Sequence, residues 1–193
     1  MIHLARKVVL VAGSPGAGKT SVLAGVTSDK YKKVGMGTLM LEEAARLGYA
    51  KDRDYLRFMD VDKLHELKLA ALKRIAKMEG NIIIDTHASV EHNARYVPGI
   101  TFKDIENLKD LSAIIYIDSF TEDIVARRSG DSTRKREDER LELIDIQRLI
   151  NVSVLSTCAS CLGIPIYVVL NMQDKLNDSI NEMKSHLVSV FGE

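Results

Sequence analysis

The sequence lacks three features that would each point to a particular class of protein. It has only two cysteines, Cys158 and Cys161, whereas a structural zinc site needs about four ligands, so no such site is expected. Lys and Arg together number 27, as do Asp and Glu, so no basic tail for nucleic acid and no basic patch for a membrane surface is expected. No segment approaches the ~18 consecutive apolar residues of a membrane-spanning helix, and the first residues lack the apolar core and cleavage site of a signal peptide. These absences predict a cytoplasmic protein with no nucleic-acid or membrane partner.

The two cysteines form a C-x-x-C pair, which leaves two interpretations open. A redox dithiol is one, but such a pair usually opens a helix after a strand, and this pair lies late in a helical pattern. We favour the other, in which two small buried residues lie one helical turn apart.

The chain is rich in short apolar runs that alternate with longer helical patterns. Its 193 residues, 46% of them apolar, are enough for one good core, so we expect a single domain over residues 1–193. Five β-branched runs are predicted to be strands: 7–12, 31–35, 81–86, 112–118 and 164–171. Their apolar residues are continuous rather than alternating, which is typical of strands covered on both faces. The pattern predicts an α/β fold with a parallel sheet.

Six segments show the 3.6-residue apolar spacing of helices. They are 18–28, 38–47, 60–79, 120–129, 139–162 and 175–191. Gly48 and Gly80 are candidate C-terminal caps, and Asp60 or Asp62 is a candidate N-cap. Two segments have little regular pattern, 87–102 and the charged stretch 129–140.

The strongest motif in the chain is G-x-x-x-x-G-K-[ST], which begins at Gly13 and ends at Lys19 and Thr20. It follows the first predicted strand and precedes a helix, so its backbone N–H groups are expected to cradle phosphates. The alternative, a tight turn whose lysine only caps the surface, does not account for the agreement of motif, strand and helix. We therefore assign nucleotide binding to Gly13, Ser14, Pro15, Gly16, Ala17, Gly18, Lys19, Thr20 and Ser21.

A metal site is expected beside this loop. Asp85 closes the apolar run "NIIID", where a carboxylate at the end of a strand meets Mg²⁺ or its waters. With the hydroxyl of Thr20 it would hold the Mg²⁺ that accompanies nucleotide phosphates. The alternative is that Asp85 caps the following loop.

Arginine is concentrated in one part of the chain, and this favours a kinase over other phosphate-binding proteins. The cluster comprises Arg127, Arg128, Arg134, Arg136, Arg140 and Arg148. Several guanidinium groups aimed at one place suit a transferring phosphoryl group, although any one of them could instead belong to a solvated helix face. Gly130, Ser132 and Thr133 make the stretch 129–140 look like a short lid that excludes water.

An acceptor site is expected near a second pair of arginines. Arg53 and Arg57 are spaced i, i+4 and would share one helical face, where they could hold a second phosphate. A structural role for this pair is about as well supported by the sequence alone.

The order of six motifs resembles the archaeal type of adenylate kinase, from about residue 7 to residue 171. The motifs are "GSPGAGKT", "VGMGTLM", "DRDYLR", "IIIDTH", "YVPG" and "RRSGDSTRKREDE". The resemblance implies the three-layer P-loop nucleoside monophosphate kinase fold, with a five-stranded parallel sheet in the order 2-3-1-4-5 and helices on both faces. It also implies reversible phosphoryl transfer from Mg·ATP to AMP, giving two ADP, and a homotrimer.

The resemblance also assigns residues to roles. The catalytic set it implies is Lys19, Arg128, Arg134 and Arg136, with Arg127 as the alternative to Arg128 and a lid over 129–140. The AMP-binding segment is about 35–60, and the AMP residues are Gly37, Thr38, Met40, Arg53, Arg57, His87, Tyr96 and Gly99. For His87, the role of a loop histidine without a ligand is equally open.

One departure from the family pattern concerns the long helix after the lid. The family usually has a further arginine near the position of Asn151 and Val152, and this chain has Arg148 about one turn earlier. Either Arg148 substitutes for it, or the clamp has one cation fewer. Two other functions stay open from the sequence, a kinase for another nucleoside monophosphate or small metabolite and a regulatory P-loop ATPase.

Overall fold

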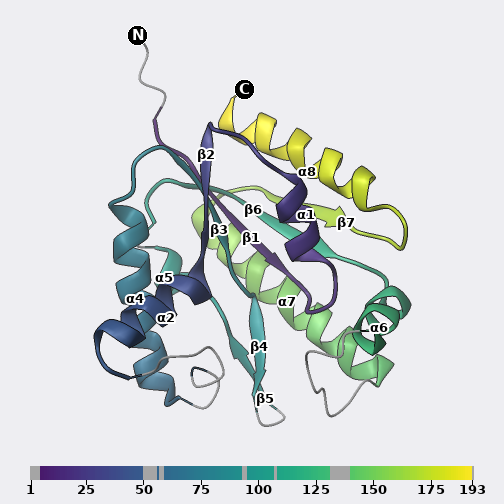
Figure 1. Ribbon diagram of the computed structural model, residues 1–193, viewed down its shortest axis with the longest axis horizontal. Helices are drawn as coiled ribbons and strands as arrows, with labels where there is room; N and C mark the ends of the chain where they lie inside the picture. Colours follow the sequence, from purple (N-terminus) through teal and green to yellow (C-terminus); the bar gives the residue numbers. More distant parts are fainter. Residues whose placement is uncertain are drawn as a thin grey trace.

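The structure is a computed structural model that describes residues 5–49, 56, 59–92, 95–106, 108–130 and 140–192. All five predicted strands form and pair in parallel in one sheet (Figure 1). They are β1 (Val8–Gly13), β2 (Tyr31–Gly35), β3 (Asn81–Asp85), β6 (Leu111–Asp118) and β7 (Ile166–Leu170). The spatial order is β2-β3-β1-β6-β7, which is 2-3-1-4-5 when these five are counted along the chain. The expected order is confirmed.

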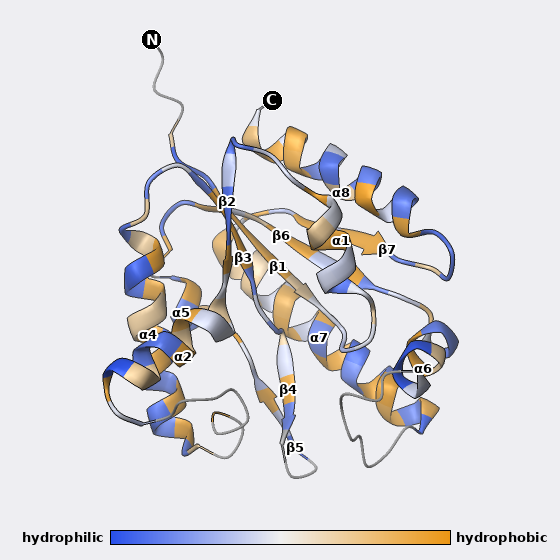
Figure 2. Ribbon diagram, in the orientation of Figure 1, coloured by the Kyte–Doolittle hydropathy of each residue, from blue (hydrophilic) through white to orange (hydrophobic). Residues whose placement is uncertain are grey.

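Helices cover both faces of this sheet, so the molecule has three layers. Alternate residues of a strand point to opposite faces: Val9 and Ile83 pack on one side, and Leu10 and Ile84 on the other. The first side is covered by α1 (Lys19–Gly25) and α8 (Leu176–Phe191). The second is covered by α2 (Met36–Arg46), α4 (Val61–Ala76), α5 (Phe102–Ile105) and α7 (Leu141–Leu162). Figure 2 shows the inner strands hydrophobic along their length and the helices striped, as two-sided burial requires.

The helices form close to their predicted positions, and the expected signals at Asp60 and Gly48 are found at helix ends. The 120–129 pattern becomes α6 (Thr121–Ser129), which contacts α7. The Asp60 side chain caps α4 by accepting a hydrogen bond from the Asp62 backbone N–H at 2.9 Å. Gly48 (φ 75°) follows the cap residue of α2 in the left-handed conformation that favours glycine, as expected. Gly80 also has a positive φ of 79°, but α4 ends earlier and is capped at Lys77, so the cap expected at Gly80 is wrong. The main differences are that α1 ends at Gly25 and α4 at Ala76, whereas the patterns ran to residues 28 and 79.

The segment 87–102 is more regular than its sequence predicts. It contains an antiparallel hairpin of β4 (Ser89–His92) and β5 (Arg95–Pro98), in which Val90 pairs with Val97. Each strand has only four residues and mixes apolar with polar side chains, so neither gives a clear strand pattern. The hairpin lies beyond the end of β3 and contacts α7 (Figure 1).

The interpretation of the cysteine pair is half right. Cys158 is buried in the core beneath α7, and burial raises the pKa of its thiol. Cys161, expected to be buried as well, is exposed. Three residues make less than one full turn of a helix, so the two side chains do not point in the same direction. Within the described ranges, no helix is both long enough and apolar enough to span a membrane.

Candidate active site

The turn between β1 and α1 is built so that other chain segments can approach its backbone. A Cβ atom added to Gly13 would lie 2.7 Å from the Ile117 carbonyl oxygen of β6, so only glycine fits there. Gly16 and Gly18 have φ values of 91° and 82°, which a side chain would strain. At Gly18 a Cβ would also collide with the Asn171 side chain. The glycines of the motif therefore serve a tightly enclosed loop.

Side chains from two distant segments fasten this loop by its carbonyl oxygens. Arg128 donates to the Pro15 oxygen from Nε at 3.0 Å and from Nη2 at 2.6 Å, and Asn171 Nδ2 donates to the Ala17 oxygen at 2.8 Å. In a trans peptide the N–H points opposite to the carbonyl. The N–H groups of Gly16 and Gly18 therefore point away from these side chains, and they are suited to an anion on the other side of the loop.

Lys19 of the loop and Asp85, the residue expected to meet Mg²⁺ beside it, are brought together. The Lys19 ammonium donates to Asp85 Oδ1, because β1 and β3 are neighbours and place Val11 opposite Asp85. The Lys19 side chain is 11% exposed and that of Asp85 is 36% exposed, so the carboxylate still reaches solvent. Electrostatic attraction holds the lysine at the loop without closing off the carboxylate.

The oxygen donors near this pair fit a magnesium ion. Thr20 is exposed in the first turn of α1, and Asp85 offers a carboxylate that faces solvent. Mg²⁺ in nucleotide sites takes one or two protein oxygens, while phosphates and waters complete its shell. Among the described residues, no three or more His, Cys, Asp or Glu side chains lie together in a way that could hold a metal ion without other ligands.

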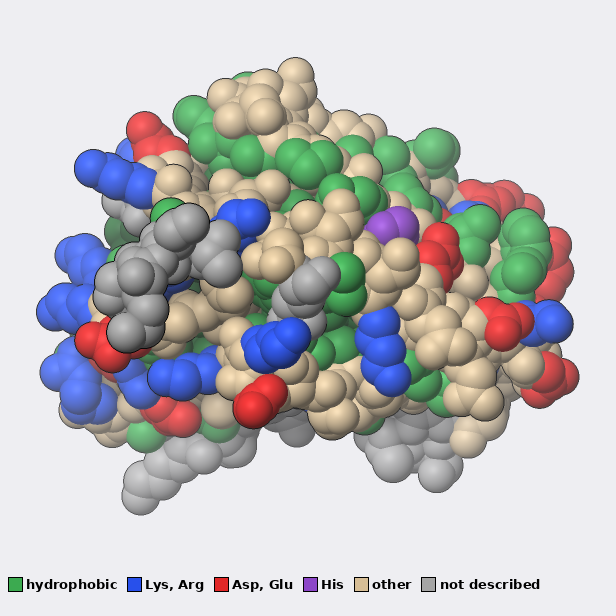
Figure 3. Space-filling model, turned by 90° about the horizontal axis from the view of Figure 1, so that it is seen from above, with side chains coloured by type: hydrophobic (Ala, Val, Ile, Leu, Met, Phe, Trp, Pro, Cys, Tyr) green, Lys and Arg blue, Asp and Glu red, His purple; other side chains and the backbone are tan. Residues whose placement is uncertain are grey.

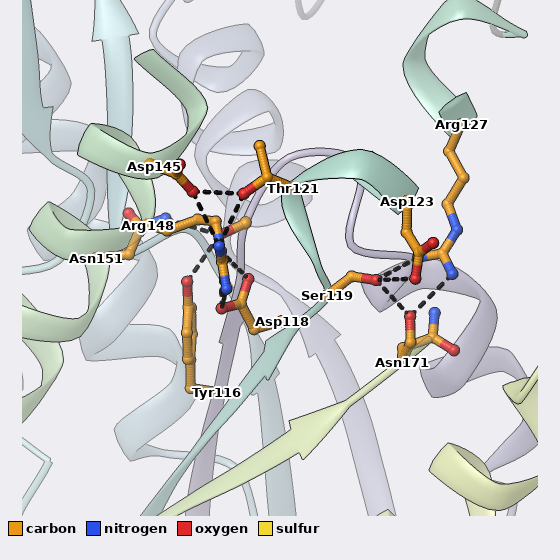
Figure 4. A network of polar contacts seen from close by, with 11 residues as sticks. Tyr116, Asp118, Ser119, Thr121, Asp123, Arg127, Asp145, Arg148, Asn151 and Asn171 are labelled. Atoms are coloured by element: carbon orange, nitrogen blue, oxygen red, sulfur yellow. Dashed lines mark hydrogen bonds and ion pairs between the residues drawn. The ribbon is translucent and has the colours of Figure 1, made fainter. Parts of the chain in front are cut away.

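Arg127 and Arg128, at the end of α6, both reach the loop region. Arg128 is buried against the Pro15 carbonyl, as described. Arg127 donates from Nη1 to Ser119 Oγ at 3.2 Å and from Nη2 to the Asn171 carbonyl at 2.8 Å (Figure 4). Its Nη1 lies 3.8 Å from the place that a Cβ on Gly18 would take. Arg134 and Arg136, with most of the expected lid, lie outside the described residues.

Arg148 is engaged by acidic and hydroxyl groups. Its Nη2 lies 3.0 Å from Asp118 Oδ2 and its Nη1 lies 3.0 Å from Asp145 Oδ1, and Nη1 also donates to Thr121 Oγ1 at 2.8 Å (Figure 4). The hydrogen bonds with Asp118 are the main reason that the pKa of Arg148 is raised. Next to it, burial and the Asp118 charge raise the pKa of Tyr116 to about 12, so this phenol stays neutral. The guanidinium thus joins β6, α6 and α7.

The candidate acceptor residues fall into two groups at the same edge of the sheet. His87, Tyr96 and Gly99 belong to the hairpin segment, where a Cβ on Gly99 would collide with the His87 carbonyl. Tyr96 donates to the Leu143 carbonyl of α7 at 3.3 Å, and burial raises the pKa of its hydroxyl.

The second group stands in the first turns of α2, after the neighbouring strand β2. There Gly37 and Thr38 are exposed, whereas Met40 is half-buried and packs against the core. Arg53 and Arg57 lie outside the described residues, so the structure does not test their placement.

Polar side chains that were not predicted complete the site. They are Ser89, Tyr116, Asp118, Ser119 and Asn171. Asp118 and Asn171 end predicted strands, and polar residues at the carboxyl ends of parallel strands meet at one edge of the sheet. That rule could have found both of them.

Comparison with known proteins identifies the family. A family model described as an AAA domain matches residues 12–145. An adenylate kinase of Methanothermobacter thermautotrophicus is 34% identical over 184 residues, which are 94% of this chain and 99% of that protein. The chain belongs to the adenylate kinase family. Relatives in this family include the adenylate kinase of Pyrococcus horikoshii, 32% identical over 91% of this chain and 92% of that protein.

A third relative in the family is the adenylate kinase of Methanocaldococcus jannaschii, 30% identical over 92% of this chain and 96% of that protein. The fold of the chain itself is also found in a solved shikimate kinase from Bacteroides thetaiotaomicron, with a TM-score of 0.61. The two chains are 15% identical, and the match covers 95% of this chain and 99% of that one.

Proposed function

We propose that this protein catalyses reversible transfer of a phosphoryl group from Mg·ATP to AMP, giving two ADP. The observation that carries the proposal is the meeting of Lys19, Asp85 and Arg128 at an enclosed P-loop, in a chain similar to adenylate kinases over nearly its full length. We assign the activity to one kinase domain with an AMP-binding segment over about 35–60 and a lid over 129–140.

The donor half of the site is the loop from Gly13 to Ser21. Its N–H groups would bind the phosphates of ATP, and Lys19 would steady the phosphoryl group during transfer. When bound at Thr20 and Asp85, Mg²⁺ would supply charge neutralisation for the phosphate oxygens. Support comes from the ion pair of Lys19 with Asp85, which keeps both charged groups beside the loop that would bind the donor phosphates.

The acceptor half would be formed by the hairpin and by the segment after β2. Gly37, Thr38 and Met40 would bind AMP from one side and His87, Tyr96 and Gly99 from the other, with Arg53 and Arg57 on its phosphate. Support comes from the sheet, since β2 and β3 are neighbours and both groups follow their carboxyl ends. Arg134 and Arg136 would close over the reacting phosphates from the lid.

No general base is needed in this reaction. The phosphate oxygen of AMP is already an anionic nucleophile, so catalysis comes from in-line positioning and from charge stabilisation. Two anionic substrates repel each other, and the positive charges of Lys19, Arg127 and Arg128, which lie at or beside the loop, would offset part of that repulsion.

The deciding experiment supplies Mg·ATP with a panel of acceptors and quantifies every nucleotide by chromatography. We expect two ADP for each AMP consumed and much slower reaction with CMP, UMP and GMP. A different preferred acceptor would assign the protein to another monophosphate kinase. Loss of ATP at the same rate without any acceptor would instead indicate a regulatory ATPase.

The acceptor site is tested separately by Arg53→Ala. We expect the KM for AMP to rise about tenfold, since a charge-assisted hydrogen bond is worth roughly 1.5–3 kcal/mol, while the KM for ATP changes little. Lys184→Ala, an exposed position on α8, is the matched control for loss of one cation. Equal changes in both KM values would remove Arg53 from the acceptor site.

Assembly as a homotrimer and location in the cytoplasm also belong to the proposal. Support for self-association comes from the run between Leu149 and Met172, which contains no charged residue although parts of it are exposed. Leu149 is 68% exposed on α7, and Val168 and Leu170 are exposed on the edge strand β7. Figure 3 shows hydrophobic side chains gathered in its upper part, which is the rear of Figure 1, where α7 lies behind the sheet. Exposed apolar patches of this kind mark interfaces.

Sedimentation equilibrium tests the assembly. The chain has a mass of 21.5 kDa, and we expect three times this mass for the native protein. Leu149→Glu should dissociate it by placing a charge in the uncharged surface, whereas Glu142→Gln, an exposed change on the same helix, should not. A native protein with the mass of one chain would overturn the trimer.

A further inference from the structure

Four buried polar side chains from four segments form one connected line through the centre of the site. Ser14 Oγ of the P-loop shares a hydrogen bond of 2.7 Å with the Tyr116 hydroxyl of β6. Asn151 Nδ2 of α7 donates to Ser14 Oγ at 3.3 Å, and Ser89 Oγ of β4 donates to Asn151 Oδ1 at 2.6 Å. Their exposures are 3% for Ser14, 1% for Tyr116, 1% for Asn151 and 2% for Ser89. Each group therefore depends on the others for its hydrogen bonds.

Asn151 lies between Ser14 and Ser89 in this line, and it is a polar residue at a fully buried position of α7. Further along the same helix, the residues buried in the core are Leu155, Cys158 and Ala159. Burying an amide without hydrogen-bond partners lowers the stability of the fold by about 1–3 kcal/mol, and an apolar residue at this position would carry no such desolvation penalty. Because the amide uses its oxygen on one neighbour and its nitrogen on another, its chemistry suits a link between two segments.

The two segments that Asn151 links are the donor loop and the acceptor hairpin. Ser14 is the second residue of the P-loop motif, and Ser89 opens the hairpin two residues after His87. The hairpin has a second attachment to α7 through Tyr96 and the Leu143 carbonyl. A single rigid helix thus holds both halves of the site, and Asn151 touches both of them.

We propose that Asn151 is a positioning residue that fixes the distance between the donor loop and the acceptor hairpin, and thereby the alignment of the two reacting phosphates. The proposal rests on the proposed function, because it needs two nucleotides in one site. Reacting atoms must lie about 3–3.5 Å apart and in line, and a displacement of about 1 Å can cost a hundredfold in rate. Asn151 touches neither nucleotide in this proposal and acts only through Ser14 and Ser89.

The experiment measures the first turnover by rapid quench, together with both KM values, for the wild-type protein, Asn151→Leu and Ser89→Ala. Leu has the same branched shape as Asn and no hydrogen bonds, although its two methyl groups are larger, and Ser89→Ala removes one arm with less risk to folding. We expect the first-turnover rate to fall about 30-fold in Asn151→Leu and about fivefold in Ser89→Ala, with each KM within about threefold of wild type. The double variant should be no slower than Asn151→Leu, because Ser89 acts through Asn151.

Cys158→Ala is the matched control for lost stability. Cys158 is buried on the same helix, and its position seven residues beyond Asn151 corresponds to about 10 Å of helix. We expect a lower Tm with an unchanged first-turnover rate.

Each outcome bears on one of the two proposals. A wild-type protein that forms no ADP ends the proposed function, independently of Asn151. An active wild type whose Asn151→Leu and Ser89→Ala variants lose only Tm, as Cys158→Ala does, overturns the positioning role. A rise in a single KM with an unchanged first-turnover rate also overturns it, since Asn151 would then serve one nucleotide only.

Discussion

Arg127 on α6 and Arg148 on α7 lie near the same edge of the sheet but differ in the groups that accept their hydrogen bonds (Figure 4). Among the described residues, Arg127 donates to the Ser119 hydroxyl and the Asn171 carbonyl, which carry no charge. Arg148 donates to the carboxylates of Asp118 and Asp145. The two guanidinium groups are chemically identical, and their surroundings give them different uses.

Neutral partners orient an arginine without cancelling its charge. The nearest carboxylate drawn beside Arg127, that of Asp123, is joined to it only through Ser119 Oγ (Figure 4), so more of the positive charge remains beside the P-loop, close to Gly18, than at Arg148. Arg148 is neutralised by its carboxylates, and to reach a phosphate it would have to leave Asp118 buried and unpaired. The contacts of Arg148 fasten α7 to β6 and α6, and they favour the alternative in which it does not join the phosphate clamp.

The largest expected effect is on stability, in Arg148→Met. Removing one partner of a buried ion pair costs about 3–5 kcal/mol, because Asp118 is left charged without a partner. The free energy of unfolding from urea titrations should fall by that amount, and adding Asp118→Asn should restore much of it. An unchanged stability together with a lost first-turnover rate would break the comparison, since Arg148 would then be a clamp.

Lys19→Met should have the next largest effect, on the rate. Lys19 also pairs with a carboxylate, but Asp85 reaches solvent and can keep Mg²⁺ or water when the lysine turns to a phosphate. We expect kcat to fall about a hundredfold, roughly 3 kcal/mol of transition-state stabilisation, with a small change in Tm. Steady-state kinetics measure kcat, and thermal melts measure Tm. A large decrease in Tm would show that Lys19, like Arg148, has a structural role.

Arg127→Gln should have the smallest effect of the three. Glutamine is two bonds shorter than arginine, so the change removes the charge together with the hydrogen bonds to Ser119 and the Asn171 carbonyl. We expect kcat to fall about tenfold, or 1.4 kcal/mol, with a free energy of unfolding about 1 kcal/mol below that of wild type. Full activity in this variant would show that the uncancelled charge of Arg127 is not used.

Much of the fold could be predicted because it is encoded locally. Continuous apolar runs marked all five strands of the sheet, and the resemblance to a family supplied their order. The hairpin of β4 and β5 could not be predicted, since its short strands have no apolar face of their own and are held by α7. That Asp85 lies beside the P-loop was expected from two local motifs at the ends of two strands, but its ion pair with Lys19 was not.

The sequence by itself determined where a nucleotide phosphate can be held, since a P-loop needs only glycines, a lysine and a threonine at fixed spacing. Only the tertiary structure decided which arginines keep their charge and what Asn151 connects. Arg148 meets Asp118 across 30 positions, and Asn151 meets Ser14 across 137. Such partners are chosen by how α7 packs against the sheet, because hydrogen bonds and ion pairs depend on distances of about 3 Å that no local spacing fixes.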